Sequence, residues 1–241
     1  MKVSIIVPAF NEEKLLGQTL ARIKSAGTAF VHLGWETELI VCDNNSTDRT
    51  AEIARAAGAT VVCEPVNQIS RARNSGAAVA TGHWLIFVDA DSQPGAELFA
   101  DTAKLIQAGD CIAGGAVIRW DQVSLPAELA TSVVNVVFRW RRLLSGAFIF
   151  IETSAFRKIG GFSQEVYVGE DLELSRRLKK LARETGRRFV ILHRHPIVTS
   201  ARRARRFSLG AHLQFLFCLV FDPHHAITDR AAAQAWYDGR R

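Results

Sequence analysis

The stretch from residue 86 to residue 93 reads IFVDADSQ and places two carboxylates at the end of an apolar run. Asp89 and Asp91 stand two residues apart, so in an extended segment their side chains point to the same side. Their repulsion must be offset by a Lys or Arg partner or by a hard divalent cation. The competing interpretation is a turn that caps the following helix, a role that suits Ser92 or Gln93 better. The pattern therefore leaves a cationic side-chain partner, a metal site and a capping turn open at this strand end.

Apolar strands and helical patterns alternate along the first 110 residues. The strands are continuous apolar runs, which indicates a parallel sheet covered by helices on both faces. Ligands bind such sheets beyond the carboxyl ends of the strands, where the polar clusters VPAFNEE, VCDNNSTD and VDADSQ fall. We expect strands at Val3–Val7, Glu38–Cys42, Thr60–Cys63 and His83–Val88. Helices are expected at Glu12–Ala29, from Ser46 or Thr47 to Ala57, at Arg71–Ala80 and at Gly95–Ala108.

The pattern changes after Asp110, but no linker rich in Gly, Pro or Ser interrupts the chain. We therefore predict one domain with two functional halves. Acids in the first turn and bases in the last turn of GEDLELSRRLKKL favour a helix that begins there. Further strands are expected in CIAGGAVIRW, GAFIFIET and FVILH, with a helix at Leu129–Leu143.

Composition narrows the function classes. The 241 residues are 48% hydrophobic and 22% charged, which is typical of a globular protein. Residues 1–138 hold 10 Lys/Arg against 15 Asp/Glu, whereas residues 139–241 hold 20 against 9. The basic half suits anionic lipid or a phosphorylated substrate, and without an accompanying signature it does not indicate nucleic acid. Neither G-x-G-x-x-G nor a P-loop follows the first strand, which disfavours a dehydrogenase or a P-loop ATPase.

The cellular compartment is inferred from three features of the sequence. The four cysteines are scattered without metal-ligand spacing, as reduced thiols of a cytosolic core would be. The chain starts with the strand KVSIIVP rather than with a signal peptide. No window approaches the roughly 20 apolar residues that cross a bilayer. We expect a cytoplasmic protein.

Six motifs in order resemble family 2 glycosyltransferases of the GT-A fold, in a compact bacterial form without transmembrane segments. They are PAFNEE (8–13), DNNSTDRT (43–50), RARNSG (71–76), DAD (89–91), GGF (160–162) and GEDLELSRRL (169–178). The resemblance implies a single GT-A domain over residues 1–241, with a Rossmann-like, mostly parallel central sheet and helices on both faces. Residues 1–110 would bind a nucleotide-sugar, and residues 111–241 would bind the acceptor and carry the base.

The resemblance also implies a donor site. Asp89 and Asp91 would hold Mg²⁺ or Mn²⁺ bridging the donor diphosphate, and Gln93 would add a carbonyl oxygen. Asp43 would bind the nucleobase, although an Asx turn is its alternative. Arg71 is preferred to Arg73 as the diphosphate ligand, since a solvated helix face accounts for one of the two. The remaining donor contacts would be Pro8, Ala9, Phe10, Glu12, Ala90 and Arg202.

In the same family, the Asp of the "ED" motif is the general base that takes a proton from the acceptor hydroxyl. This places Asp171 in the catalytic role. The adjacent Glu170 would raise the pKa of Asp171, and the helix N-terminus would lower it. The alternative is that both are helix-terminal acids, a role that Glu173 already fills. Phosphate contacts would come from two or more of four arginines: Arg202, Arg203, Arg205 and Arg206.

The sequence thus predicts an inverting, metal-dependent glycosyltransferase that moves a sugar from a UDP- or GDP-sugar to an acceptor hydroxyl or a lipid phosphate. A nucleotidyltransferase is the nearest rival in chemistry, but PAFNEE lacks the Gly-rich loop and the Lys expected there. A non-catalytic nucleotide-sugar-binding protein is a second rival, which the two intact acidic pairs disfavour. The oligomeric state stays open.

Two basic and apolar segments raise the question of a membrane. Residues 133–144 and 207–221 are too short to span a bilayer, but a basic amphipathic helix can lie among lipid headgroups. Such peripheral contact with the inner face of the membrane would suit a lipid-linked acceptor. The alternative is that these faces pack in the core or in a dimer interface.

Overall fold

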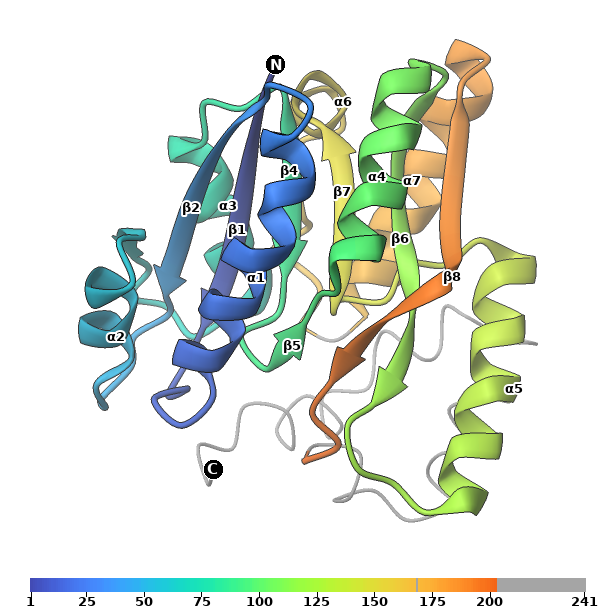
Figure 1. The fold of residues 1–241 in the computed structure, drawn as a ribbon. Coiled ribbons are helices and arrows are strands. Elements are labelled where there is room, and N and C mark those ends of the chain that lie inside the picture. The colour runs from blue at the N-terminus through green and yellow to red at the C-terminus, as the bar shows by residue number, and fades with distance from the viewer. Residues whose placement is uncertain (168, 203–241) are drawn as a thin grey trace.

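The computed structural model describes residues 1–167 and 169–202, which form one α/β domain around an eight-stranded sheet (Figure 1). The strand order is β3-β2-β1-β4-β7-β6-β8-β5. The strands are β1 Lys2–Ala9, β2 Glu36–Asp43, β3 Thr60–Cys63, β4 Trp84–Val88, β5 Ser92–Gln93, β6 Cys111–Trp120, β7 Phe148–Glu152 and β8 Arg188–Thr199. The helices are α1 Leu16–Val31, α2 Thr50–Ala56, α3 Ile69–Val79, α4 Ala96–Ala108, α5 Leu125–Arg141, α6 Thr153–Lys158 and α7 Glu170–Thr185.

The first four strands form the parallel part of the sheet. β1 pairs with β2 and with β4, and β2 pairs with β3, all in parallel. β1 is buried over seven consecutive residues, as expected for a strand covered on both faces. Because these strands run the same way, their carboxyl ends meet at one edge, where the polar motifs of the sequence lie.

Beyond β4 the sheet becomes mixed. β7 runs antiparallel to both β4 and β6, β8 runs parallel to β6, and the two-residue β5 pairs antiparallel with β8. The predicted fold class is confirmed, and its parallel character is concentrated in the half that precedes residue 110. The antiparallel strand β7 therefore lies between the two parallel groups and joins them into one sheet.

Helices cover both faces of the sheet (Figure 1). On one face, α1 and α4 pack against the sheet through a core that includes Phe30, Phe99 and Phe148. On the other face, the core around Phe87 and Phe162 includes residues of α3, α6 and α7. Helix α5 lies to the side, next to β6 and β8. In the described ranges, no helix combines the length and apolarity that a membrane span requires.

The main departure from the predicted elements concerns the start of α1. The helix expected from Glu12 begins at Leu16, because the preceding backbone is bound elsewhere. The N–H of Glu12 donates to the Thr50 hydroxyl at 2.8 Å, and the N–H of Glu13 donates to the Asp48 carboxylate at 3.1 Å. These bonds hold residues 10–13 at the end of β1. The 207–221 segment considered for membrane contact lies outside the described residues.

Candidate active site

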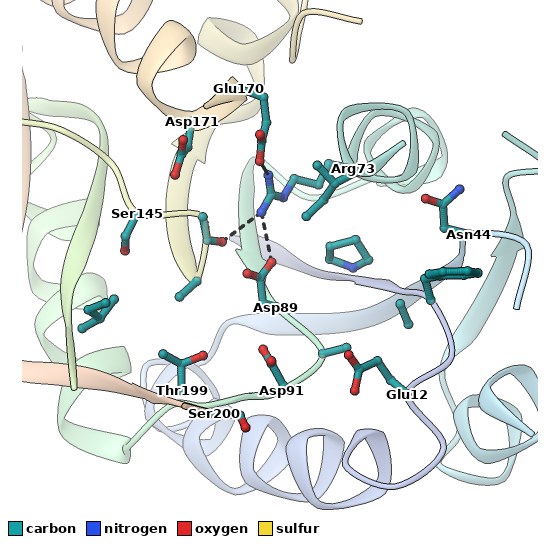
Figure 2. Close-up of a pocket in the computed structure, with 18 of the residues that line it drawn as sticks. Glu12, Asn44, Arg73, Asp89, Asp91, Ser145, Glu170, Asp171, Thr199 and Ser200 are labelled. Atoms are coloured by element: carbon teal, nitrogen blue, oxygen red, sulfur yellow. Dashed lines mark hydrogen bonds and ion pairs between the residues drawn. The ribbon is translucent and has the colours of Figure 1, made fainter. Parts of the chain in front are cut away.

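A cavity of about 270 Å³ opens at the carboxyl ends of β1 and β4 (Figure 2). Its walls come from both halves of the chain: the ends of β1, β4 and β8, the loop before β7 and the start of α7. Nine of the residues named from the sequence line it, namely Pro8, Ala9, Phe10, Glu12, Asp89, Ala90, Asp91, Glu170 and Asp171. The sheet thus brings the two acidic pairs, about 80 residues apart in sequence, to one cavity.

Asp89 and Asp91 occupy the turn that leaves β4. The N–H of Asp89 donates to the carbonyl of Ala147 at 3.3 Å, and the N–H of Ser92 donates back to the carbonyl of Asp89 at 3.0 Å. Asp91 is buried, and its carboxylate lies 3.5 Å from the guanidinium of Arg202. The turn therefore holds both carboxylates against the cavity, as Figure 2 shows.

Arg73 connects the two acidic pairs. Its guanidinium is buried and donates to Glu170 at 2.6 Å, to Asp89 at 3.0 Å and to the carbonyl of Gly146 at 3.1 Å. It also lies over the ring of Phe162, 5.1 Å from the centroid. Burial alone would lower the pKa of Arg73, but the surrounding carboxylates raise it above its ordinary value. The guanidinium is therefore a fixed positive charge between two carboxylates.

Gly146 makes room for this arrangement. A Cβ atom on Gly146 would lie 2.7 Å from the Nη2 atom of Arg73 and 3.6 Å from a carboxylate oxygen of Asp171. The first distance is too short for a carbon next to a guanidinium nitrogen that already bonds the Gly146 carbonyl. Any larger residue would displace the arginine from its carboxylates.

Asp171 is the carboxylate with the most unusual environment. Gly169 adopts a left-handed conformation with φ of +79°, and α7 then begins at Glu170. Burial raises the pKa of Asp171 to about 7, and the adjacent Glu170 adds to this rise. Arg73 and the backbone N–H groups of Leu172 and Gly146 oppose it. Asp171 is thus a carboxylate that exchanges a proton near neutral pH, as a general base requires.

Glu12 and Arg202 close the opposite side of the cavity. The Glu12 carboxylate is 2% exposed and accepts a hydrogen bond from Arg202 Nη2 at 2.7 Å. The same nitrogen faces Asp91, so the arginine bridges the end of β1 and the end of β4. Arg202 lies beside the cavity rather than in its wall, whereas the other three arginines predicted with it fall outside the described residues.

Besides Arg202, three residues predicted for the donor site lie outside the cavity wall: Asp43, Arg71 and Gln93. Arg71 pairs with Glu64 at 3.2 Å, because residues two apart on a helix point in different directions and Arg73 takes the cavity side. The Asp43 carboxylate accepts the N–H of Ser46, three residues on, at 3.2 Å, a local backbone role like that of the Asx turn considered as its alternative. Gln93 lies in β5 and pairs with β8. Their predicted ligand roles stay predictions.

Several cavity residues were not singled out from the sequence: Asn44, Ser145, Gly146, Thr199 and Ser200. Asn44 directly follows Asp43 and fixes the neighbouring loop, since its side chain donates to the carbonyl of Val66 at 2.6 Å. Adjacency to a polar motif could have pointed to Asn44. No local sequence pattern points to Ser145 or Thr199. They line the cavity because β6, β7 and β8 pair in one sheet.

Asp89 and Asp91 have the chemistry to hold a divalent metal. Both offer hard carboxylate oxygens to the cavity, and Mg²⁺ and Mn²⁺ sites of this kind use one or two carboxylates with substrate phosphates. Within the described residues, no group of three or more His, Cys, Asp or Glu side chains could form a metal cage. A cation here would therefore take part of its coordination from a ligand, which is the arrangement that a diphosphate provides.

Comparison with known proteins identifies the family. Residues 4–164 match the sequence model of glycosyl transferase family 2. The chain belongs to this family. Its motifs from PAFNEE to GGF fall within the matched range.

Individual relatives agree with this assignment. The probable glycosyltransferase YdaM of Bacillus subtilis is 29% identical over 206 residues, which cover 75% of this chain and 47% of YdaM. The chain thus spans about half the length of this relative. Among solved structures, the mannosyltransferase PcManGT from Pyrobaculum calidifontis, in complex with GDP-Man and Mn²⁺, superposes with a TM-score of 0.68 at 21% identity. This match covers 99% of the present chain and 75% of PcManGT.

A second solved structure has the same fold. Residues 1–349 of S. aureus TarS, in complex with UDP-GlcNAc, superpose with a TM-score of 0.65 at 22% identity, over 84% of this chain and 59% of the TarS chain. Such likenesses establish the GT-A fold of this family 2 glycosyltransferase. The neighbours bind different nucleotide-sugars, so the fold alone does not select the donor.

Proposed function

We propose that this family 2 enzyme is an inverting, divalent-metal-dependent transferase that moves a sugar from a UDP- or GDP-sugar to an acceptor hydroxyl or a lipid phosphate. The observation that carries the proposal is the single cavity in which Asp89 and Asp91 face Glu170 and Asp171 across Arg73. One acidic pair would bind a metal and a diphosphate, and the other would handle a proton.

The chemical step assigned to Asp171 is proton removal from the acceptor. The ionised carboxylate takes the hydroxyl proton while the acceptor oxygen attacks the anomeric carbon of the donor sugar. The bond from that carbon to the diphosphate breaks on the opposite face, and the diphosphate leaves with the electron pair. A carboxyl group with a pKa of about 7 suits this task, because it is both ionised and appreciably basic near neutral pH.

Charge on the leaving diphosphate requires positive partners. When bound at Asp89 and Asp91, Mg²⁺ or Mn²⁺ would supply electrostatic stabilisation of this charge. Arg73 holds Asp89 in place, and Arg202 lies next to Asp91 and Glu12. Arg202 lies beside the cavity, so its planar guanidinium could turn from these two carboxylates to the phosphate oxygens of a bound donor.

Glu170 has a supporting role in this scheme. Its carboxylate accepts a hydrogen bond from Nη1 of Arg73, while its negative charge raises the pKa of Asp171.

We place the reaction in the cytoplasm, since the described cysteines Cys42, Cys63 and Cys111 are free thiols, as in a reducing compartment.

The direct test is hydrolysis of a panel of UDP-, GDP- and dTDP-sugars by the full chain in the presence of Mn²⁺. We expect release of UDP or GDP together with free sugar of inverted anomeric configuration. A nucleotidyltransferase would instead consume a nucleoside triphosphate and a sugar phosphate and release pyrophosphate. If the chain bound a nucleotide-sugar but transferred the sugar neither to water nor to any acceptor, it would be a non-catalytic nucleotide-sugar-binding protein.

A further inference from the structure

Helix α5 exposes its apolar side. Five large apolar residues follow one another at spacings of four, four, three and four, so they form one stripe along the helix. Their side chains are between 52% and 76% exposed. We call this the α5 stripe; it consists of Leu125, Leu129, Val133, Val136 and Trp140.

The side of α5 that faces the protein makes polar contacts as well as apolar ones. Asn135 donates to the carbonyl of Ile118 at 2.8 Å and accepts the N–H of Ile118 at 3.2 Å. Thr131 accepts the indole N–H of Trp120 at 2.9 Å. A helix on the surface of a protein in water normally buries its large apolar residues. α5 instead leaves five of them exposed, which indicates that its outer face has an apolar partner.

Positive charge gathers at the C-terminal end of the stripe. Lys179 of α7 donates to the carbonyl of Arg141 at 3.0 Å. Burial lowers the pKa of Lys179, and so do the nearby cations Arg141, Arg183 and Arg142. Among the described residues, none of these four cations pairs with a carboxylate. Arg141 lies instead over the ring of Trp140, 5.7 Å from its centroid.

We propose that the α5 stripe and its basic end dock on the surface of an anionic lipid bilayer. An apolar helix face with a terminal Trp and adjacent cations is suited to the boundary between headgroups and acyl chains. The other occupants match the charge less well. α5 itself contains one acid, Glu128, so the stripe of a second copy offers few partners for the four cations. Residues 203–241 carry six arginines against three aspartates and bring no excess of negative charge.

A membrane-docked α5 indicates a lipid-linked acceptor, an extension that rests on the proposed function. Phe138 of α5 and Leu172 of α7 pack together and line the catalytic cavity, so the docked helix also borders the site. A lipid-linked acceptor could then place its reacting group beside Asp171 while its chain stays in the bilayer. In Figure 1, α5 lies at the side of the domain next to β6 and β8, whereas β2 and β3 lie at the other side.

The test is co-sedimentation of the full chain at low salt with vesicles of phosphatidylcholine alone or of equal parts phosphatidylcholine and phosphatidylglycerol. We expect binding to the anionic vesicles, weaker binding in high salt and little binding to phosphatidylcholine. The variant Leu129→Glu/Trp140→Glu should bind at least tenfold less. The matched control is Val31→Glu/Val79→Glu, which adds the same charge at exposed apolar positions of α1 and α3 and should bind like the wild type.

Three results would overturn the docking surface. The first is that the wild type does not bind anionic vesicles, and the second is that both double variants lose vesicle binding equally. The third is that the stripe variant unfolds or changes its sedimentation coefficient. The last would show that residues 203–241 or a second copy cover the stripe. Hydrolysis of the nucleotide-sugar in solution should be unchanged in the stripe variant. If the wild type binds vesicles but hydrolyses no donor, the proposed function fails while the docking surface stands.

Discussion

The two acidic pairs of the cavity contain the same kind of side chain in two different environments. Asp89 and Asp91 follow a buried strand, and each has a guanidinium within 3.5 Å, from Arg73 and Arg202 respectively. Asp171 begins a helix, and its neighbours in direct contact are backbone N–H groups, while Arg73 bonds the adjacent Glu170.

The difference explains how one cavity can divide the chemistry. In the proposed function, Asp89 and Asp91 would offer their carboxylate oxygens to a metal. Asp171 is a half-buried carboxylate beside another carboxylate and its pKa is raised, which suits the base role proposed for it. Position in the fold, rather than residue type, would then separate the two proposed roles.

The largest effect is expected from removing the strand-end pair. Asp91→Ala should lower metal-dependent turnover by at least about 10³-fold, about 4 kcal/mol, because the leaving diphosphate loses its stabilising charge. Excess EDTA should lower wild-type turnover comparably. The control Asp110→Ala removes an exposed carboxylate that pairs with Arg188 far from the cavity, and its turnover should be unchanged. Full wild-type turnover in EDTA would contradict the metal assignment.

Removing the connection between the pairs should destabilise the whole domain. Arg73→Met leaves buried Glu170 and half-buried Asp89 without their shared guanidinium, so the free energy of unfolding should fall by about 3–5 kcal/mol. Arg71→Met, two residues away, removes a half-exposed arginine from Glu64, which keeps its hydrogen bonds from Ser75 and from the Val66 N–H, and should cost about 1 kcal/mol or less. Urea denaturation measures both. Equal losses in the two variants would show that Arg73 does not organise the cavity.

Replacing Asp171, in the first turn of α7, should stabilise the protein. The raised pKa means that folded Asp171 keeps its proton where the unfolded chain has already released it, so this residue lowers stability as pH rises from about 4 to 7. Asp171→Asn removes that dependence. Its midpoint of thermal unfolding should exceed that of the wild type by at least about 4 °C at pH 8, about 2 kcal/mol, and by less at pH 5. A variant less stable than the wild type at both pH values would contradict this account.

How far the sequence predicts this molecule depends on the range of the interactions involved. The bounds of β3 and β6 and the strand end that carries Asp89 and Asp91 follow from continuous apolar runs. These are local patterns, and the structure confirms them. The start of α1 could not be predicted, because the bond from the Glu12 N–H to Thr50 joins residues 38 positions apart.

The same limit applies to the choice between Arg71 and Arg73. Both arginines stand in one motif, and the sequence alone offers no reason for the second to be buried. The reason is Glu170, 97 positions later, together with the opening left by Gly146. The resemblance to a family identified nine residues of the cavity wall, but only the folded sheet shows which arginine joins the two acidic pairs.

The division of roles between the pairs is tested most directly by Asp171→Asn in hydrolysis of the donor, where water is the acceptor and still needs a base. Turnover should fall by about 10²–10⁴-fold, while the affinity for the donor in the presence of Mn²⁺ stays within about threefold of the wild type. Glu173→Gln, which alters another acid in the first turn of α7, serves as the control and should retain turnover. A different result would contradict the account: Asp171→Asn binds the donor much more weakly but keeps wild-type turnover when the donor is saturating. Asp171 would then be a binding residue.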